Sequence, residues 1–312
     1  MAHPRKFRFG VQLSNAPTGD AWRDLARKAE DLGYSTLFMP DHFGDQLAPV
    51  PALQAAADAT TKLNVAALVF DNDYKHPVVL AKEMATIDVL SGGRTEFGLG
   101  AGWMNTDYEQ SGIPKDRDGV RIARMAEGLE VIKGLWGDGA YSFSGEHYTI
   151  TGMDGLPKPV QKPGPPILIG GGGPKVLGIA GKYADIVGIN PSIPKGEVGP
   201  DAARDAAPDR VDQKLQWLKD GAGDRFDSLE LNALVFVVIV TDDPQPMREM
   251  IAGVFGVGVD ELNDTPYAWI GSTGEIADQL RRARDRWGFS YFVVQGDAID
   301  SVAPIVAELS GT

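Results

Sequence analysis

The chain has 312 residues, of which 43% are hydrophobic and 23% are charged, and its formal net charge is −13 at pH 7. This composition excludes a disordered chain, because so many apolar side chains can form a large buried core. The acidic balance argues against binding to nucleic acid or to an anionic membrane, which requires clustered Lys and Arg, and the absence of cysteine excludes disulfides, thiolate nucleophiles and cysteine-bound metals.

The amino-terminal residues show no hydrophobic targeting segment. Residues 1–7 lead directly into a strand-like run. The longest strongly apolar stretch, residues 234–240, is far shorter than the roughly 20 residues that cross a membrane. We therefore expect a cytoplasmic protein that acts on a small molecule and has neither a membrane nor a nucleic acid as partner.

Short apolar runs alternate with helical patterns along the whole chain. Several runs are apolar at every position, as in strands that are buried on both faces of a parallel sheet. Between them lie apolar stripes at helical spacing, such as Trp22, Leu25, Ala29 and Leu32. The eight predicted strands are residues 9–13, 36–39, 63–70, 95–99, 166–169, 186–189, 231–240 and 291–294.

Eight strand–helix repeats are the pattern of an α/β protein with a (β/α)8 barrel, the TIM barrel. We expect one domain over residues 1–312, with a hairpin at 141–149 and insertions at 190–208, after the sixth strand, and at 252–267, after the seventh. Long segments of this kind more often cover an active site than link domains. In such barrels the site lies at the carboxyl ends of the strands, so the search concentrates on the residues that follow each strand.

Asp41 and His42 directly follow the second predicted strand, and His42 is one of only four histidines. Imidazole exchanges a proton near neutral pH, and an adjacent carboxylate can orient it. The alternative is a loop in which Asp41 is a cap and His42 is merely packed. The pair makes His42 the candidate general acid or base and Asp41 its candidate partner.

A run of four glycines follows the fifth predicted strand and precedes Pro174, which suits the first turn of a helix. Glycines let backbone N–H groups approach a ligand closely, and a helix amino terminus favours an anion. The run predicts a phosphate site, with a tight strand-to-helix turn as the alternative. It matches neither a P-loop nor a GxGxxG motif, which argues against the common nucleotide-binding folds.

Alternating glycines at 98, 100 and 102 precede Trp103 after the fourth strand. They leave room either for a flat ring or for the packing of a neighbouring strand. Asp71 and Asp73 follow the third strand, but no His or Glu cluster at ligand spacing accompanies them, so we expect no metal site. A phosphate site, a glycine-lined slot and one histidine together indicate a phosphorylated ring cofactor and redox chemistry.

Several motifs together give the sequence a resemblance that covers nearly its whole length. They are Asp41-His42 and residues 75–82, 90–94, 98–103, 134–136, 271–275 and 291–294. In these the sequence resembles the bacterial-luciferase-like superfamily. The Asp-His pair is similar to that of the branch that uses the deazaflavin coenzyme F420 rather than FMN.

The resemblance implies a barrel that binds its cofactor at the carboxyl ends of the strands. It implies a non-proline cis peptide between Ala67 and Leu68 that backs the deazaflavin ring, and it places His42 over the ring near the reacting carbon. Gln12, Ser14 and Phe43 are candidate walls of the substrate pocket. The candidate cofactor-binding residues are Ala67, Leu68, Gly102, Trp103, Gly171, Gly172 and Gly173.

The sequence departs from the family at Asp107, where the family usually has Glu, and we expect Asp107 to pair with an Arg of the next helix. The acidic residues 71–73, and the absence of a recognisable basic pocket such as the family's sugar-phosphate dehydrogenases use, argue against a sugar phosphate as substrate. The expected activity is hydride transfer between F420 and an organic substrate, with His42 moving the proton and Asp41 either orienting His42 or contacting the edge of the ring. The alternatives are an FMN-dependent monooxygenase and a non-catalytic deazaflavin carrier. Because related barrels commonly pair, a homodimer is a further expectation.

Overall fold

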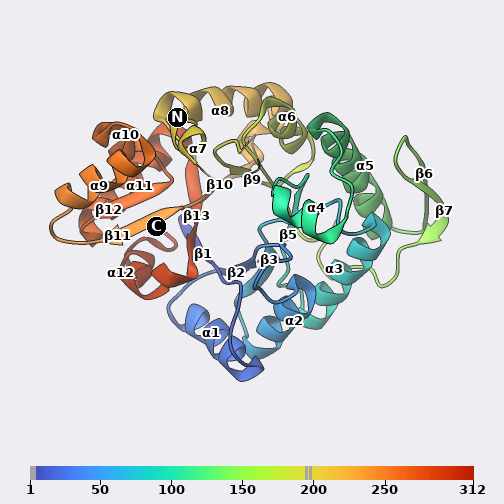
Figure 1. Ribbon diagram of the computed structural model, residues 1–312. Helices are drawn as coiled ribbons and strands as arrows, with labels where there is room; N and C mark the ends of the chain where they lie inside the picture. Colours follow the sequence, from blue (N-terminus) through green and yellow to red (C-terminus); the bar gives the residue numbers. More distant parts are fainter. Residues whose placement is uncertain (1–4, 194–195, 197–198) are drawn as a thin grey trace.

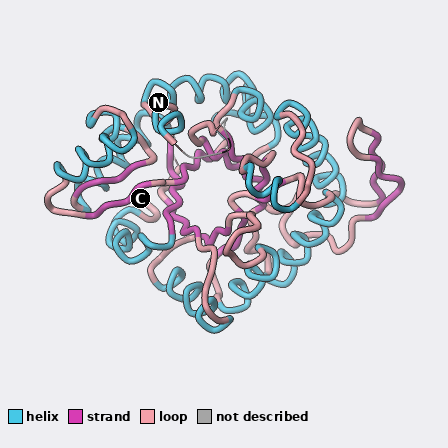
Figure 2. The backbone as a smooth tube through the Cα atoms, in the orientation of Figure 1, coloured by secondary structure: helices cyan, strands magenta, loops and turns pink. Residues whose placement is uncertain are grey.

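The computed structural model describes residues 5–193, 196 and 199–312. Its parallel strands form a ring, and helices surround that ring on the outside (Figures 1 and 2). The (β/α)8 barrel predicted from the sequence is thereby confirmed. Within the described ranges, no helix is both long enough and apolar enough to cross a membrane.

Nine short strands occupy the eight positions of the ring. They are β1 (Arg8–Gln12), β2 (Thr36–Met39), β3 (Asn64–Ala67), β4 (Phe70–Asp71), β5 (Phe97–Gly100), β8 (Ile167–Gly171), β9 (Ile186–Ile189), β10 (Glu230–Leu234) and β13 (Phe289–Gln295). Their order is β3-β2-β1-β13-β10-β9-β8-β5-β4. β3 and β4 are two pieces of the third predicted strand, and a bridge between Val65 and Thr95 joins β3 to the residues before β5, which closes the ring.

The helices lie outside the ring and bury one face against it. The first, for example, buries Trp22, Ala26 and Ala29, and the Thr18 hydroxyl caps its start by accepting a hydrogen bond from the Ala21 N–H. The helices are α1 (Gly19–Asp31), α2 (Pro49–Ala59), α3 (Pro77–Ser91), α4 (Asn105–Ser111), α5 (Asp118–Trp136), α6 (Pro174–Tyr183), α7 (Pro200–Arg204), α8 (Pro208–Ala222), α9 (Gln245–Phe255), α10 (Val259–Asp264), α11 (Thr273–Trp287) and α12 (Ile299–Leu309), with short 3-10 helices η1 (Gly223–Ser228) and η2 (Gly296–Ala298).

The core has two parts because side chains along each strand alternate between the barrel interior and the helices. The larger part joins the outer face of the strands to the helices. The smaller part is a separate buried cluster of strand residues, which fills the barrel: Phe38, Ala66, Leu68, Leu168, Ile186, Tyr291 and Val293. The interior is therefore packed, and a ligand has room only at an end of the barrel.

The amino-terminal end of the barrel is closed by a buried ionic network. Arg8 donates through Nε to Glu230 Oε1 over 2.7 Å, and its Nη1 contacts Glu96. Its guanidinium lies 3.5 Å from the centre of the Tyr291 ring, and the Tyr291 hydroxyl donates to Glu96 over 3.1 Å. Because every charged group here has a partner, this end offers no open site for a ligand.

The seventh predicted strand, residues 231–240, is wrong as a single strand. β10 ends at Leu234, and β11 (Val237–Val240) leaves the ring to pair in parallel with β12 (Ala268–Gly271). The change of partner occurs where the Phe236 N–H donates to the Tyr267 carbonyl over 2.9 Å. An uninterrupted apolar run carries no signal of such a change, because it suits both sheets.

The two predicted insertions follow β9 and β10, but the second is longer than the predicted residues 252–267. Residues 237–271, hereafter the 237–271 insertion, contain β11, α9, α10 and β12 and lie beside the barrel (Figure 1). The earlier insertion, 190–208, contains α7, and its residues 194–195 and 197–198 lie outside the described residues. The predicted hairpin is also present, as the antiparallel pair β6 (Ala140–Ser144) and β7 (Thr149–Asp154).

Candidate active site

The predicted catalytic histidine lies at the carboxyl-terminal end of the barrel, and its partner is Asp107. His42 Nδ1 is 2.6 Å from Asp107 Oδ2. The buried Asp107 carboxylate also accepts hydrogen bonds from the Tyr74 hydroxyl, over 3.0 Å, and from the Phe43 N–H, over 3.2 Å. Among the described residues, His42 Nε2 has no partner. The imidazole is thus held through one nitrogen and presents the other.

Two expectations about this pair are wrong. Asp107 does not pair with an arginine of the next helix, because α4 follows β5 directly and points the carboxylate at His42. Arg121 of α5 instead donates to the carbonyls of Ala101 and Gly102, over 2.6 and 2.5 Å. Among the described residues, the hydrogen-bond partner of His42 is therefore Asp107 and not its chain neighbour Asp41.

Asp41 joins the ends of two strands. Its Oδ2 accepts a hydrogen bond from the Asp71 N–H over 3.1 Å, which ties the residue after β2 to β4. Burial raises the pKa of the Asp41 carboxyl above its usual range. Asp41 therefore lies beside His42 as a partly buried acid.

Aromatic rings form a wall next to His42. The Trp103 ring meets the imidazole edge-on, with centroids 5.6 Å apart and an interplanar angle of 88°. The Phe43 ring lies 4.5 Å from that of Tyr74 and is 51% exposed. Burial, followed by the charges of Asp71 and Asp107, raises the pKa of Tyr74, so its phenol keeps the proton that it donates to Asp107.

The other two predicted wall residues lie at the end of β1 and just after it. Gln12 is the last residue of β1, and its Nε2 donates to Gln295 Oε1 over 3.4 Å, while its own Oε1 is buried without a partner. Ser14 is exposed, and its carbonyl accepts a hydrogen bond from the Leu47 N–H over 2.9 Å. Both residues therefore lie at the same end of the barrel as His42.

The cis peptide in the third strand lies between Leu68 and Val69, one residue beyond the predicted Ala67–Leu68 bond. The bond implied by the family resemblance is one residue too early, because β3 continues through Ala67, which still pairs with Met39 of β2. The bond occupies the gap between β3 and β4. Ala67 and Leu68 are both buried there.

Val69 and the Ala67 carbonyl explain two of the alternating glycines. A Cβ on Gly100 would lie 2.5 Å from Val69 Cγ2, and one on Gly98 would lie 2.0 Å from the Ala67 carbonyl oxygen. At these two positions the structure supports the packing alternative, because the neighbouring strand fills the space. Gly170 of β8 also faces Val69, because a Cβ on Gly170 would lie 3.5 Å from Val69 Cγ1.

Gly102 makes room for a buried carboxylate. Its φ is +73°, and a Cβ there would lie 1.9 Å from the Tyr108 hydroxyl and 2.2 Å from Asp71 Oδ2. The Tyr108 hydroxyl donates to that oxygen over 3.0 Å. Burial is the main cause that raises the pKa of Asp71 to about 6. The neighbouring Asp73 is neutralised by Arg124, at 2.7 Å.

The glycines after β8 differ in what surrounds them. A Cβ on Gly171 would meet Val176 at 2.5 Å, and one on Gly172 would meet the Asn190 carbonyl oxygen at 2.4 Å. Gly173, which precedes the first residue of α6, has open space where a side chain would be. The first N–H groups of a helix lack partners within it. The arrangement therefore combines a close-packed turn with an open helix terminus that suits an anion.

Unpaired polar atoms at this end fit a ring cofactor with polar edges. The Asn190 Oδ1, directly after β9, is buried and has no hydrogen-bond partner in the described part of the chain, and the same holds for Gln12 Oε1. The Asn190 side chain lies next to Gly170, whose Cβ would be 3.5 Å from Asn190 Nδ2. Buried polar atoms without partners are costly unless a ligand pairs with them. Over the described ranges, no group of three or more His, Asp or Glu is arranged to hold a metal ion.

Four residues of this end had no role in the sequence-based site: Tyr74, Val69, Asn190 and Asp107 as the partner of His42. Asp107 and His42 are 65 positions apart in sequence, so no local motif joins them. Asn190 directly follows the predicted strand 186–189, and this position is the sequence feature that could have identified it as a site residue. The contact partners of Tyr74 and Val69 come from other strands and helices and become visible only in the fold.

Comparison with known proteins places the chain in a family. Residues 5–207 match the luciferase-like monooxygenase family. The FMNH(2)-dependent dimethylsulfone monooxygenase of Pseudomonas putida is 29% identical over 203 residues, which are 59% of this chain and 56% of that protein. The F420-dependent glucose-6-phosphate dehydrogenase of Nakamurella multipartita is 28% identical over 262 residues, 79% of this chain and 72% of that protein.

Solved structures share the fold of this chain. An F420-dependent secondary alcohol dehydrogenase, solved with an F420-acetone adduct, superimposes with a TM-score of 0.78 at 19% identity, over 98% of this chain and 99% of that chain. The chain spans little more than half the length of the Pseudomonas relative. The match over residues 5–207 covers well over half of this chain, so the protein belongs to the luciferase-like monooxygenase family.

Proposed function

We propose that the protein is a coenzyme F420-dependent oxidoreductase that transfers a hydride between the deazaflavin and a small organic substrate. The observation that carries this is the His42–Asp107 contact of 2.6 Å, which leaves His42 Nε2 available at the open end of a filled barrel. Relatives that are named as F420-dependent dehydrogenases, such as the Nakamurella enzyme, support the choice of cofactor.

The residues at this end suit such a cofactor. Leu68, with Ala67 before it and Val69 after the cis bond, would back the ring, and Gly102 and Trp103 would border it. The Asn190 and Gln12 oxygens without partners would accept hydrogen bonds from its polar edge. The phosphate would lie at the start of α6, near Gly171, Gly172 and Gly173, where backbone N–H groups and the helix dipole favour an anion.

His42 performs the proton transfer in this proposal. Bound deazaflavin supplies a ring carbon that accepts or donates a hydride. With Nδ1 donating to Asp107, the neutral imidazole has an acceptor at Nε2. Nε2 takes the hydroxyl proton of an alcohol as its carbon loses the hydride, and it returns the proton when a carbonyl is reduced. Asp107 stabilises the imidazolium that forms in the first direction.

Two alternatives remain distinct proposals. An FMN-dependent monooxygenase is favoured by the name of the Pseudomonas relative, and it predicts a preparation that binds FMN and consumes oxygen with a reductase partner. A non-catalytic deazaflavin carrier predicts binding without turnover. We favour the F420 oxidoreductase, because a proton-transferring dyad has no purpose in a carrier and deazaflavin chemistry favours hydride transfer over oxygen activation.

The test is a fluorescence titration with F420 and with FMN, followed by turnover of the His42→Ala variant. Secondary alcohols and glucose 6-phosphate, named in the relatives, are the first substrates to try. We expect saturable F420 binding, and a loss of turnover of about 10²- to 10⁴-fold with cofactor affinity retained. The control is His147→Ala, in the turn between β6 and β7. Absence of F420 binding would refute the proposal.

Three further properties belong to the same proposal. We propose that residues 1–312 act as one domain, that the protein works in the cytoplasm, and that two copies pair as a homodimer. Light scattering on the purified protein measures the last of these. A mass equal to that of one chain, 33.4 kDa, would exclude the dimer.

A further inference from the structure

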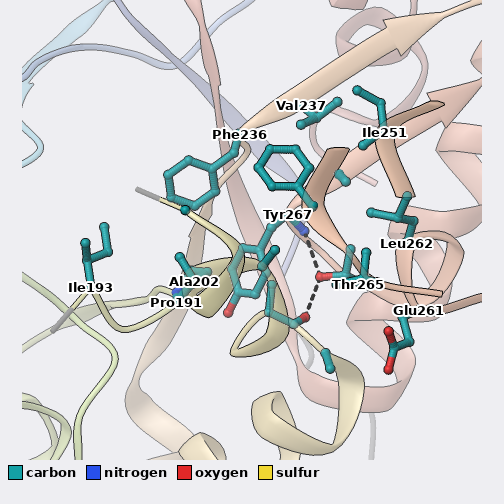
Figure 3. A pocket seen from close by; sticks show the side chains of 17 residues that line it. Pro191, Ile193, Ala202, Phe236, Val237, Ile251, Glu261, Leu262, Thr265 and Tyr267 are labelled. Atoms are coloured by element: carbon teal, nitrogen blue, oxygen red, sulfur yellow. Dashed lines mark hydrogen bonds between the residues drawn. The ribbon is translucent and has the colours of Figure 1, made fainter. Parts of the chain in front are cut away.

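A second cavity lies beside the barrel, between α7 and the 237–271 insertion (Figure 3). The space between its lining residues, counted together with the solvent at its mouth, is about 660 Å³. Its wall is built mainly from small and apolar side chains, including Ala202, Ala203, Phe236, Ile251, Leu262 and Tyr267. The shape and composition are those of a binding pocket for an apolar group rather than a gap in the packing.

The polar groups in the wall are already paired with protein atoms. The Thr265 hydroxyl donates to the Ala206 carbonyl over 2.7 Å, and the Tyr267 hydroxyl donates to the Ile189 carbonyl over 2.9 Å. The Glu261 carboxylate accepts a hydrogen bond from the Gly258 N–H over 2.8 Å. A ligand therefore finds apolar surface and no unpaired donor. The lining includes no Lys or Arg among its described residues, so the pocket does not suit an anion.

The pocket adjoins the carboxyl-terminal rim of the barrel at β9 and β10. Pro191, in its wall, directly follows Asn190, whose unpaired Oδ1 belongs to the candidate active site. Phe236, which is 39% exposed, stands two residues beyond the end of β10. The Tyr267 hydrogen bond to the last residue of β9 fixes the far wall to the same rim. Two walls of the pocket are thus attached to the rim at which Asn190 lies.

We infer that this pocket takes the uncharged aliphatic or aryl tail of the enzyme's own substrate. The inference rests on the proposed function, since the reacting carbon of that substrate would lie at the rim, next to His42. It assigns the substrate to neutral alcohols or carbonyl compounds with an apolar chain. It argues against sugar phosphates, because a phosphate would meet a wall of alanines and aromatic rings.

The test measures how binding depends on chain length. Acetone, 2-hexanone and 2-nonanone share one carbonyl group and differ only in the tail, and their dissociation constants are measured by calorimetry without cofactor. We expect affinity to rise by up to about fourfold for each added methylene until the pocket is full. An affinity that is equal along the series would overturn the inference.

Three variants locate the effect. Ile251→Lys puts a charge into the pocket, whereas Val254→Lys puts the same charge on the outer face of the same helix, where Val254 is 67% exposed. We expect Ile251→Lys to weaken the binding of 2-nonanone by more than tenfold and Val254→Lys to change its dissociation constant by less than twofold. Ala203→Leu keeps the wall apolar but fills part of the pocket. The increase in affinity with chain length should therefore stop at a shorter ketone. Thermal melts check that each variant folds, and equal effects of both lysine variants would contradict the proposed location.

The two proposals fail separately. If F420 binds but the affinity for ketones does not depend on chain length, the apolar substrate pocket is refuted and the oxidoreductase proposal is not. Length-dependent ketone binding without F420 binding would refute the cofactor assignment, and the pocket would remain as a site for apolar ligands. Reduction of 2-nonanone with a lower KM than that of acetone, in the presence of reduced F420, would support both.

Discussion

The two ends of the barrel contain buried polar groups of similar kinds and treat them in opposite ways. At the amino-terminal end, Arg8 pairs with Glu96 and Glu230, and Tyr291 completes the network. At the carboxyl-terminal end, oxygens of Gln12 and Asn190 have no partner within the described residues. Paired buried groups stabilise the ring, and unpaired ones are a cost that a ligand can offset. Stability and function thus occupy opposite ends of the same strands.

The largest expected effect is at the closed end. Arg8→Met leaves the Glu96 and Glu230 carboxylates buried without their cation, so the free energy of unfolding should fall by about 3–5 kcal/mol. Urea denaturation measures this, and F420 affinity of the folded variant should be unchanged. The matched control is Arg27→Met, which removes an exposed pair with Asp24 and should cost less than about 1 kcal/mol. A similar cost for both variants would refute the contrast between the ends.

The next effect concerns the open end. Asp107→Asn keeps the shape but removes the carboxylate that holds His42, and we expect kcat to fall by about a hundredfold with F420 affinity retained. KM for F420 should stay unchanged while kcat falls, a split that a purely structural role would not produce. Asp107→Glu should restore much of the rate. If Asp41→Asn lowers kcat more than Asp107→Asn does, the assigned partner is wrong.

Asp71 gives a pH-dependent contrast. Its pKa of about 6 in the folded protein lies above the ordinary value of 3.8, so the folded state retains a proton that the unfolded state has lost. The free energy of unfolding should therefore fall as pH rises from about 4 to about 6. Asp71→Asn should remove about 2–3 kcal/mol of this fall. Urea titrations at several pH values test it, and a slope unchanged by the substitution would contradict the raised pKa.

The smallest effect tests the unpaired atoms directly. Asn190→Leu replaces a side chain whose buried Oδ1 has no partner by an apolar one of similar size. We expect a gain of about 1 kcal/mol in the free energy of unfolding and a loss of about tenfold in F420 affinity. Thermal denaturation and fluorescence titration give the two numbers. A variant that loses both stability and affinity would show that Asn190 is structural.

The barrel was predictable from the sequence because its signal is repeated along the chain. Runs such as residues 36–39 and 186–189 match the observed strands at both ends. The failures occur where the local pattern fits two partners equally. Residues 231–240 are apolar throughout, yet the second half pairs outside the ring. The family resemblance placed the cis peptide at Ala67–Leu68, one residue before its position at Leu68–Val69.

The candidate site also contains residues that the sequence identified and residues that it did not. His42 was identifiable because it is a rare residue type at a strand end, and Gly171 to Gly173 because they precede a helix. The role of Asp107 was not, because its contact with His42 joins residues from β2 and α4 that only the closed ring brings together. At Gly98 and Gly100 the glycine pattern suggested room for a flat ligand, but the space is filled by Val69 and the Ala67 carbonyl.

The separation of β11 and β12 from the ring has an evolutionary consequence. The pair forms its own two-stranded sheet, so sequence drift there leaves the hydrogen-bond register of the barrel intact. Mutations that reshape this side element can therefore accumulate without disturbing the strand pairing on which the ring depends.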